Sequence, residues 1–521
     1  MKANVDIMRV LLDTNIFIER EDNKIISENL QELLRLLNSI GATILIHPKS
    51  IEELNNDKDE TRKKVVISKI KSYPALESPP YPSNDVSFDS VIGPIKNITN
   101  VHDLNDIVLL YSIFRNAADF LITEDKGIHS KSNKVELSDR IFTILDAITA
   151  LRNLTKPKKE VYSPPPIAKK PLHNFKLEDP FFNDLKEDYG PSFNDWYNKK
   201  AKEGKEAYVY LNPDGKLGAF LMLKDEDENI KAYPENLPKK KRLKISTLKV
   251  SNIGNKLGEL FLNISFNYAI KNGFDEVYLT HFIREDDYLV PLIENFGFIK
   301  NSNYIIHQHT EKKEYIFVKN FSPKSKVKIR EIREKFFPCY YDGPAVDKFI
   351  VPIKPEYHER LFIDTKGRQT KFKEFSGKFI VEGNSIQKAY LCNAPTYRMK
   401  KNDILIFYHS VNNQAVTSLG TIDEVHYNLR GVGQILNYVA KRTVYTKQEI
   451  EDFPKPLTVI LFRFHFQLPK AVEYQELIKN KILKGAPQTI LKVSHENYLK
   501  IKDLSEIDEK LTISNLEEMS Q

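Results

Sequence analysis

The chain has 521 residues, of which 41% are apolar and 29% charged, and its formal net charge is +7. This length exceeds one ordinary hydrophobic core and predicts about three domains. No apolar run approaches the ~18 residues of a membrane span, and the N-terminus lacks a signal-peptide pattern. Two cysteines, Cys339 and Cys392, are too few for a disulfide framework or a thiolate zinc site. We therefore expect a cytoplasmic protein without a membrane partner.

Two changes of composition divide the chain. The stretch from Arg152 to Asn174 is rich in proline and lysine and favours a stiff, extended linker. The stretch from Phe321 to Pro338 is basic and predicts a short connecting helix. The predicted parts are residues 1–151, a linker at 152–174, residues 175–322, a linker at 323–336, residues 337–508 and a tail at 509–521. The expected fold class is multidomain, α/β plus α+β.

The first part alternates predicted strands and helices. RVLLD, ATILIHP and DFLITED read as strands, whereas ENLQELLRLLNSI, SIEELNND and LNDIVLLYSIFRNA read as helices. Short apolar strands interleaved with helices argue for a parallel sheet covered on both faces. Ligands of such sheets bind beyond the carboxyl ends of the strands, which is where Asp13 and Asp125 lie.

Four acids recur at the junctions between these elements. They are Asp13 after RVLL, Glu53 in HPKSIEEL, Asp106 in HDLNDIVLL and Asp125 in FLITED. Taken singly, the aspartates are helix caps or first-turn residues, and Glu53 is a solvated first-turn acid. Taken together, converging carboxylates are the ligands that Mg²⁺ or Mn²⁺ prefers. A metal held there would activate a water and neutralise charge as a phosphodiester bond breaks.

The motifs LLDTNIF, SIEEL, NDIVLL and LITED, in this order, resemble the PIN-domain family of metal-dependent ribonucleases, which includes many toxin nucleases. The resemblance covers about residues 8–150 and implies a PIN-like parallel α/β sheet. It implies catalytic and metal-binding roles, with Mg²⁺ or Mn²⁺, for Asp13, Glu53, Asp106 and Asp125. Asn15 and Thr123 are the expected supports of these ligands. The neighbouring acids Glu52, Glu124 and Asp103 stay open as alternatives.

The middle part begins with EAYVYLNPDGKLGAFLMLKDE, which predicts a hairpin closed by an Asn-Pro-Asp-Gly turn. NLPKKKRLKIS reads as a basic insertion. A strand, the glycine-containing loop SNIGNKLG and a long helix follow, and then the strand DEVYLTHF and the helix in DDYLVPLIENFGFIK. Backbone N–H groups at a helix start beside glycines can hold a pyrophosphate. The structural alternative is a plain turn between strand and helix.

With its surroundings this loop resembles the GNAT-type N-acetyltransferases, which implies a mixed sheet and a site for acetyl-CoA. The implied cofactor-binding residues are Val250, Gly254, Asn255, Lys256, Leu257 and Gly258. The sequence departs from the family at Ile253, where Gln or Arg is usual, at Lys256, where Gly is usual, and at Ile293. Many members carry at the last position a Tyr that protonates the departing thiolate. Neither Tyr288 nor Tyr304 can be assigned that role, and the acids of REDD (284–287) are either a base or a solvated loop.

The last part is rich in short predicted strands: GKFIVEG, DILIFYHS, SLGTIDEV and LTVILFRF. Their order resembles the PUA-like β-barrels, which include the ASCH and EVE domains, over roughly residues 337–505. The resemblance implies binding of RNA or of a modified nucleotide. Basic and aromatic residues suited to phosphate contact and base stacking, or else to an ordinary surface and core, are Lys388, Tyr390, Tyr397, Arg398, Lys400, Lys401, Lys441, Arg442 and Tyr445. His307 and His309 have strand spacing and are interpreted as structural.

These resemblances predict an RNA-acting, toxin-like protein with metal-dependent endoribonuclease chemistry and an acetyl-CoA-binding domain. Expected partners are RNA, with tRNA as a natural candidate, and an antitoxin or other protein. The alternative function is an N-acetyltransferase acting on protein or aminoacyl-tRNA, with an accessory or inactive nuclease domain. A third, non-enzymic alternative is an RNA-binding adaptor.

Overall fold

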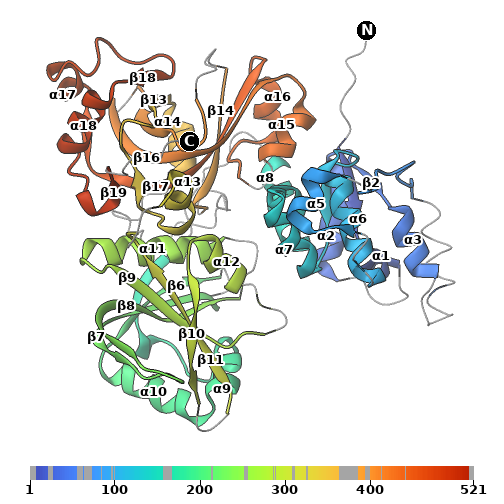
Figure 1. Cartoon of the computed structure of the whole chain (residues 1–521), viewed down its shortest axis with the longest axis horizontal. Coiled ribbons are helices and arrows are strands. Elements are labelled where there is room, and N and C mark those ends of the chain that lie inside the picture. The colour runs from blue at the N-terminus through green and yellow to red at the C-terminus, as the bar shows by residue number, and fades with distance from the viewer. Residues whose placement is uncertain are drawn as a thin grey trace. The chain divides into compact units, whose positions relative to one another are not determined.

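The computed structural model describes residues 8–514, with the exception of 22–26, 56–62, 64–72, 84, 96–97, 99, 156–166, 213–214, 252–255, 285–286, 288, 308–310, 324–326, 363–384, 394–398, 412–413 and 440–441. The chain divides into two compact units. Unit 1 comprises residues 1–160, 389–393 and 426–459, and unit 2 comprises residues 161–388, 394–425 and 460–521. Figure 1 labels their helices and strands. Among the residues described, no helix is both long enough and apolar enough to cross a bilayer.

Unit 1 contains a four-stranded parallel sheet in the order β2-β1-β3-β4. Its strands are β1 (Arg9–Leu12), β2 (Thr43–Leu45), β3 (Phe120–Ile122) and β4 (Ile141–Phe142). Leu11 of β1 is buried in one core with Ile107 and Leu110. Its neighbours Val10 and Leu12, which point to the opposite face, are buried as well. The predicted parallel sheet with both faces covered is therefore confirmed.

The helices around this sheet begin at clear sequence signals. Ser27, Asn100 and Asp125 cap three of them through side-chain oxygens that accept backbone N–H groups. The helices are α1 (Thr14–Glu21), α2 (Glu28–Ser39), α3 (Pro48–Asn55), α5 (Val86–Ile92), α6 (Val101–Phe114), α7 (Lys126–Lys134), the 3₁₀ turn η2 (Ser138–Arg140) and α8 (Ile144–Thr155).

A segment far along the chain completes unit 1. It carries α15 (Val432–Val439), which packs on η2, and α16 (Lys447–Asp452), which packs on α8. Between the two helices, Arg442 binds both carboxylate oxygens of Asp139, at 3.0 and 2.5 Å. Residues 426–459 therefore belong structurally with the N-terminal α/β layers.

Unit 2 contains a seven-stranded mixed sheet in the order β10-β11-β9-β8-β7-β6-β5. Only the β8–β9 pair is parallel among the pairs described, as the predicted mixed sheet requires. The strands are β5 (Ile167–Pro171), β6 (Glu206–Leu211), β7 (Leu217–Ile230), β8 (Leu237–Val250), β9 (Glu276–His281), β10 (Ile299–Ile306) and β11 (Lys313–Asn320). Strand β5 lies inside the stretch assigned to a linker from the sequence.

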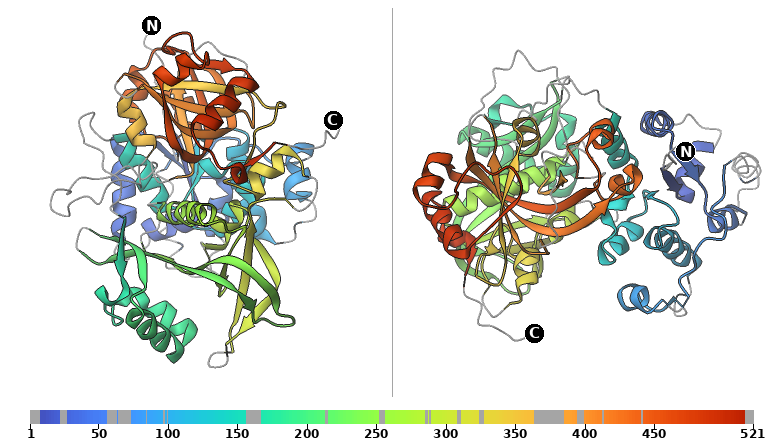
Figure 2. Two further views of the ribbon diagram at one scale, coloured as in Figure 1. Left: turned by 90° about the vertical axis from the view of Figure 1, so that its left-hand side faces the viewer. Right: turned by 90° about the horizontal axis from the view of Figure 1, so that it is seen from above.

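Helices cover both faces of this sheet. On one face, α11 (Leu257–Lys271) and α12 (Leu289–Asn295) pack on Leu243, Ile245 and Leu279. On the other face, α9 (Asn183–Tyr189) and α10 (Pro191–Lys202), with the 3₁₀ turns η3 (Leu172–Asn174) and η4 (Pro180–Phe182), surround an aromatic core. Figures 1 and 2 show α11 and α10 on opposite sides of this seven-stranded sheet.

The basic stretch NLPKKKRLKIS is not an insertion, because it forms the first half of β8. Its cations lie directly opposite acids of β7, with Arg242 facing Glu226, Lys241 facing Asp227 and Lys240 facing Glu228. Opposite charges across an antiparallel pair stabilise one register over its neighbours. The prediction of an insertion is therefore wrong, since the positive run matches a negative strand.

A further sheet, most of whose residues belong to unit 2, has six strands in the order β14-β17-β16-β15-β13-β18. Among the described residues this pairing does not close into the predicted barrel. The strands are β13 (Lys348–Ile353), β14 (Gln387–Cys392), β15 (Ile404–His409), β16 (Ala415–Leu429), β17 (Leu457–Glu473) and β18 (Leu491–Val493). Three of the four strands predicted for this part are present, whereas GKFIVEG lies outside the described residues.

Short helices and one small pair complete this part. The predicted connecting helix is α13 (Ile329–Lys335). The other elements are α14 (Pro355–Leu361), α17 (Tyr474–Lys479), α18 (His495–Leu504), the 3₁₀ turn η6 (Glu509–Leu511) and the parallel pair β12 (Tyr340–Tyr341) and β19 (Thr512–Ile513). Phe337, Cys339 and Ile386 share one buried core with α11, so the second and third predicted domains are packed together.

Candidate functional site

The predicted acidic site lies at the carboxyl edge of the parallel sheet. Asp13 follows β1 and is only 6% exposed. One of its oxygens accepts a hydrogen bond from the Thr123 hydroxyl at 2.6 Å, and the other accepts from the Thr14 N–H at 2.6 Å. The Thr14 hydroxyl in turn donates to Glu53 at 2.8 Å. The expected support by Thr123 is present, whereas the side chain of Asn15 is exposed.

Asp106 and Asp125 lie on the neighbouring side of this edge. A Cβ atom built on Gly127 would lie 2.9 Å from Asp125 Oδ1 and 3.8 Å from Asp106 Oδ2, so both carboxylates flank this glycine. Asp125 also caps α7 by accepting the Ile128 N–H at 2.8 Å. The Lys131 ammonium lies 3.5 Å from Asp106. A cation from the protein itself therefore already neutralises part of this edge.

The charges of neighbouring acids at this edge contribute to the raised pKa values of Asp13 and Asp106. Burial is the main reason that the pKa of Asp13 rises to about 6. Hydrogen bonds from Thr123 and Thr14 lower that pKa, and the charges of Glu53 and Asp125 raise it. The pKa of Asp106 rises to about 7, first through burial and then through the charge of Asp125, against the opposing charge of Lys131.

The alternatives for single acids are now resolved. Asp106 is not a cap, because Asn100 caps α6, and Glu53 lies beyond the first turn of α3. Glu52 points to solvent with Lys49. Glu124 accepts the Ile144 N–H at 2.8 Å at the start of α8, and Asp103 is half exposed beside Lys131.

As these residues lie, they do not fit a bound metal ion. Among the described residues no group of three or more His, Cys, Asp or Glu side chains is placed to hold one ion. Both oxygens of Asp13 accept protein hydrogen bonds, and Asp106 faces Lys131. The predicted Mg²⁺ or Mn²⁺ site is therefore not supported by this arrangement, although the acids lie at one edge of the sheet.

A second candidate site lies where β8 and β9 separate in unit 2. These parallel strands pair over three residues only, from Leu243–Val277 to Ile245–Leu279. Strand β8 runs on to Val250 while still paired with β7, so the β9 edge is without a strand partner on that side among the described residues. The fork therefore leaves backbone N–H and C=O groups that an extended ligand can bind.

The chain leaves β8 through the predicted cofactor loop and enters α11. Gly254 and Asn255, with Ile253, lie outside the described residues. Lys256 has a left-handed φ of +48° and provides no side-chain cap for α11. The N–H groups of the first helical turn are therefore not capped by this residue, which suits an anion. Val250 packs against the core beside α11.

Two predicted cofactor residues have an additional structural role. The side chain of Leu257 is fully buried, so only its backbone faces the fork. A Cβ atom on Gly258 would lie 2.7 Å from Leu292, so this glycine lets α11 approach α12 closely. On α12, Ile293 is fully buried, which leaves no acid at the position where the family resemblance places a tyrosine.

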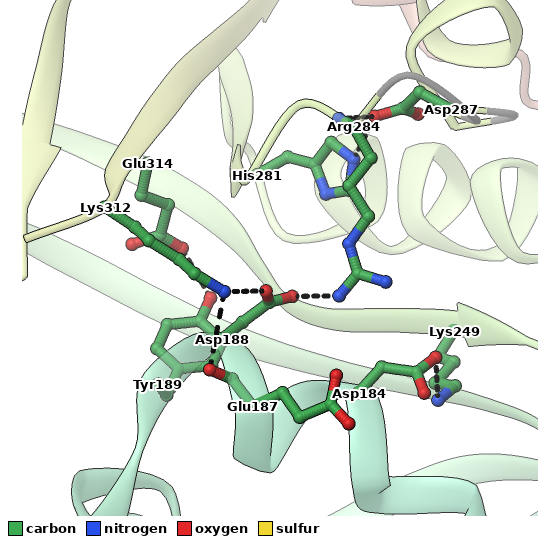
Figure 3. A network of polar contacts seen from close by, with 10 residues as sticks. All are labelled: Asp184, Glu187, Asp188, Tyr189, Lys249, His281, Arg284, Asp287, Lys312 and Glu314. Carbon is green, nitrogen blue, oxygen red and sulfur yellow. Dashed lines mark hydrogen bonds and ion pairs between the residues drawn. The ribbon is translucent and has the colours of Figure 1, made fainter. Parts of the chain in front are cut away.

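Polar side chains gather at the mouth of the fork (Figure 3). At the carboxyl end of β9, His281 Nε2 lies 2.6 Å from Asp287, which accepts the Leu289 and Val290 N–H groups at 2.9 Å each. Burial alone would raise the pKa of Asp287, but the hydrogen bonds from His281 and the Val290 backbone hold it below its usual range. Glu285 and Asp286 of REDD, and Tyr288, lie outside the described residues.

His281 was not among the site residues predicted from the sequence. The available signal was a histidine as the last residue of the predicted strand DEVYLTHF, six positions before an acid that begins a helix. The pairing needs the β9–α12 turn to fold back on itself. Periodicity places His281 at a strand end but does not reveal that turn.

Glu314 forms a buried network beside the same mouth. It accepts hydrogen bonds from Tyr189 at 2.5 Å and pairs with His307 at 2.7 Å. Burial would raise the pKa of Glu314, yet these bonds and one from Thr280 hold it below its usual range. His307 therefore has an acid partner that sequence spacing did not reveal, and His309 lies outside the described residues.

The residues proposed for RNA contact are largely unavailable. Lys388, Tyr390, Arg442 and Tyr445 are buried, and Lys388 lies over the Phe464 ring at 5.5 Å. Lys400 is exposed and Lys401 is half-buried. Tyr397, Arg398 and Lys441 lie outside the described residues. The basic and aromatic residues that the structure describes therefore do not form one exposed surface.

No family model matches the sequence, and no curated protein matches it. Several solved structures are similar to parts of the chain. An ASCH protein from Zymomonas mobilis has 11% identity and a TM-score of 0.24, covering 30% of this chain and 94% of that chain. The NatC complex bound to Gag peptide and CoA has 14% identity and a TM-score of 0.20, covering 30% and 99%. An aminoglycoside 6'-acetyltransferase type Ii has 16% identity and a TM-score of 0.20, covering 30% and 99%.

The similar structures thus include an ASCH protein and acetyltransferases, each over about a third of the chain. At such TM-scores this likeness carries no argument about activity. The resemblance to PIN domains has no support here and stays a prediction.

Proposed function

We propose that this protein is an N-acetyltransferase that uses acetyl-CoA at the β8–β9 fork. The observation that carries the proposal is the separation of two parallel strands after three pairs, directly before a helix whose N-cap residue, Lys256, provides no side-chain cap. A splayed pair offers an open strand edge for an extended, amide-containing arm, and the helix start offers N–H groups and a positive dipole end for a pyrophosphate.

The chain's own residues supply both parts of such a site. The backbone at Lys256, Leu257 and Gly258 would hold the pyrophosphate, with Gly254 and Asn255 in the same loop. The free edge of β9 beyond Leu279 would bind the arm. Bound acetyl-CoA supplies an acetyl thioester to an acceptor amine, which we propose to be on a protein or on aminoacyl-tRNA.

Isothermal calorimetry with acetyl-CoA tests this function. We expect the wild-type protein to bind, and Lys256→Glu to weaken the affinity at least about tenfold, because it places a negative charge beside the phosphates. Lys271→Glu, at the other end of α11, is the matched control and should bind as wild type does. A wild-type protein that does not bind acetyl-CoA at millimolar concentration would contradict the proposal.

We propose ribonuclease activity at the acidic edge of unit 1, with RNA as its partner, as a second candidate function. It is favoured by one observation, that the predicted acids lie at one edge of the parallel sheet, where Thr14 links Asp13 to Glu53 and Gly127 lies beside Asp106 and Asp125. Placing several carboxylates close together lowers the stability of the fold. Natural proteins retain such a site mainly where function needs it. An antitoxin or other protein partner that covers this edge belongs to the same proposal.

Cleavage of single-stranded RNA, with and without Mg²⁺ or Mn²⁺, tests the second candidate. The double variant Asp13→Asn plus Asp106→Asn should abolish cleavage. Glu28→Gln, an exposed acid in the first turn of α2, should leave it unchanged. Equal cleavage by the double variant and the wild-type protein would rule this function out. RNA binding that weakens steeply with rising salt concentration would indicate contacts to the RNA phosphates.

A further inference from the structure

We propose that His281 is the general base of the transfer reaction, held in position by Asp287. This inference rests on the acetyltransferase function proposed above and adds to it the residue that handles the proton. It concerns His281 at the end of β9, which was not predicted from the sequence, and Asp287 before α12, an acid of REDD that was.

The first argument is the place of His281 on the fork. Side chains alternate along a strand, so His281 lies on the same face of β9 as Val277 and Leu279, which pack against α11. It is the next residue on that face after Leu279, which makes the last pair with β8. An extended ligand along the free edge of β9 would therefore reach His281 directly after the paired region.

The second argument is that, on the α11 face of the fork, the side chains that β8 presents beyond its pairing with β9 are apolar. On the α11 face of β8, beyond the last pair with β9, Leu248 and Val250 pack against the core. Lys249 points to the other face, where it pairs with Asp184 at 2.8 Å. His281 is thus the only ionisable side chain of β8 and β9 on the α11 face of the fork, within the described part of the chain.

The third argument is the fixed orientation of the imidazole. Asp287 accepts the Nε2 proton of His281 at 2.6 Å and is itself fixed by the Leu289 and Val290 N–H groups. The Nδ1 atom has no hydrogen-bond partner among the described residues, and the side chain is 24% exposed. A carboxylate on one ring nitrogen leaves a lone pair on the other and stabilises the imidazolium that forms when it takes a proton.

The proton balance of the reaction follows from this arrangement. The amine nitrogen attacks the thioester carbonyl carbon, and a C–N bond forms. Nδ1 of His281 takes the proton that the nitrogen releases, while the other ring proton stays on Nε2 and remains hydrogen-bonded to Asp287. The C–S bond then breaks, and the imidazolium returns the proton to the departing thiolate. The base ends neutral, and no oxidant or further reactant is needed.

The polar groups on the opposite face of the fork are not assigned as the general base, because they already have hydrogen-bond partners. Asp188 is saturated by Arg284 at 2.5 Å and Lys312 at 3.1 Å. Glu314 is 3% exposed and already holds Tyr189 and His307. Figure 3 shows Asp188 bonded to Arg284 and Lys312, and Tyr189 beside Glu314, whereas His281 keeps one nitrogen for a ligand.

Two measurements on the full chain test the inference. In the unliganded protein, nitrogen-15 NMR of labelled histidines should find His281 in the Nε2–H form, identified by the signal that is missing in His281→Gln. With acetyl-CoA, release of the free thiol is followed with four acceptors: a peptide with a free α-amine, a lysine peptide with a blocked N-terminus, aminoacyl-tRNA and water. His281→Gln should bind acetyl-CoA as wild type does and lose at least about 100-fold in rate.

Asp287→Asn separates positioning from folding. Asparagine is also a good helix cap, so α12 should persist, but the imidazole loses the carboxylate that selects its tautomer. We expect a loss of at least about tenfold in rate and a change of the NMR tautomer. The fall of kcat/KM at acid pH should disappear in His281→Gln. His173→Gln, an exposed control in unit 2, should keep both the rate and the pH dependence of the wild-type protein.

Each outcome decides between the two proposals. A wild-type protein that does not bind acetyl-CoA overturns the proposed function, and the base assignment falls with it. Binding without turnover on any of the four acceptors contradicts both the transfer reaction and its base. Turnover by His281→Gln within threefold of wild type overturns the base assignment alone. The same holds if the unliganded protein shows His281 in the Nδ1–H form.

Discussion

For single residues, the position of a side chain in the fold could be predicted from the sequence, whereas its hydrogen-bond partners could not. The positions of Asp13 and Asp125 at strand ends could be predicted, because parallel strands place their carboxyl ends at one edge. That Thr123 and Thr14 occupy both oxygens of Asp13 could not, because these contacts depend on the relative heights of β1 and β3. Motif order therefore predicted the neighbourhood of the acids but not their ligand geometry.

The buried carboxyl of Asp13 predicts a pH-dependent stability of unit 1. Because its pKa rises to about 6 in the folded state, the folded state holds this proton more tightly than the unfolded chain. Its stabilising contribution is present at low pH and is lost as the pH rises through about 6. Asp13→Asn, which removes the charge, should stabilise unit 1 by about 1–3 kcal/mol at pH 8 and by much less at pH 5.

Hydrogen exchange of the β1 and β3 backbone amides, compared between variant and wild type at each pH and with a metal chelator present, measures this effect. Glu28→Gln is the control, since that acid is exposed on α2 and should alter exchange at neither pH. Equal protection by Asp13→Asn at pH 5 and pH 8 would show that burial of the ionised carboxylate is not the cause.

Helices and strands with strong apolar periodicity were predicted correctly. The strand that is stabilised by charge pairs with its neighbour was not. The β6–β7 hairpin and strands β15, β16 and β17 follow from alternating apolar residues and turn signals. The first half of β8 did not, because its cations read as a solvated loop until their partners on β7 are known. Cross-strand charge pairing is a non-local property that a local window cannot detect.

One glycine at the end of α12 predicts a large effect on unit 2. Gly297 has a φ of +85°, and a Cβ atom there would overlap the Lys335 carbonyl at the end of α13. That carbonyl also accepts the buried Lys319 ammonium at 3.0 Å, so it cannot shift freely. Gly297→Ala should therefore destabilise unit 2 by about 3 kcal/mol or more, through both backbone strain and steric overlap.

Gly273→Ala provides the matched comparison for this variant. Gly273 also has a positive φ, of +68°, but the nearest atom to an added Cβ is the Lys510 ammonium at 3.5 Å. It should cost about 1 kcal/mol, from strain alone. Thermal unfolding followed by the fluorescence of Trp196, the single tryptophan and part of unit 2, measures both. Equal shifts of Tm would disprove the steric part of the argument.

At the scale of the whole molecule, the sequence predicts consecutive domains, whereas the compact units are discontinuous. Composition breaks mark where a chain changes texture, but they do not show that a late segment returns to an early one. Arg442, which was expected either to contact RNA or to belong to an ordinary surface and core, marks this return in the structure. A buried arginine needs a carboxylate, and its partner Asp139 lies 303 positions earlier.

This pairing predicts that unit 1 depends on the returning segment. Arg442→Ala should destabilise unit 1 by about 3 kcal/mol, because it removes a side chain that is only 9% exposed and leaves Asp139 without its bidentate partner. Arg430→Ala, an exposed arginine in the same segment, should have no comparable effect. Limited proteolysis of the full chain detects this loss of stability as faster cleavage within residues 1–160, with the fragments identified by mass spectrometry.

The same reasoning predicts that residues 1–160 expressed alone do not fold stably, because the surfaces of η2 and α8 that pack against α15 and α16 would be exposed to water. Adding residues 426–459 as a separate peptide should restore protection of α8 in hydrogen exchange. A stable, monomeric fragment of residues 1–160 would show that the early α/β layers form a domain of their own. The returning segment would then be an addition to a complete fold.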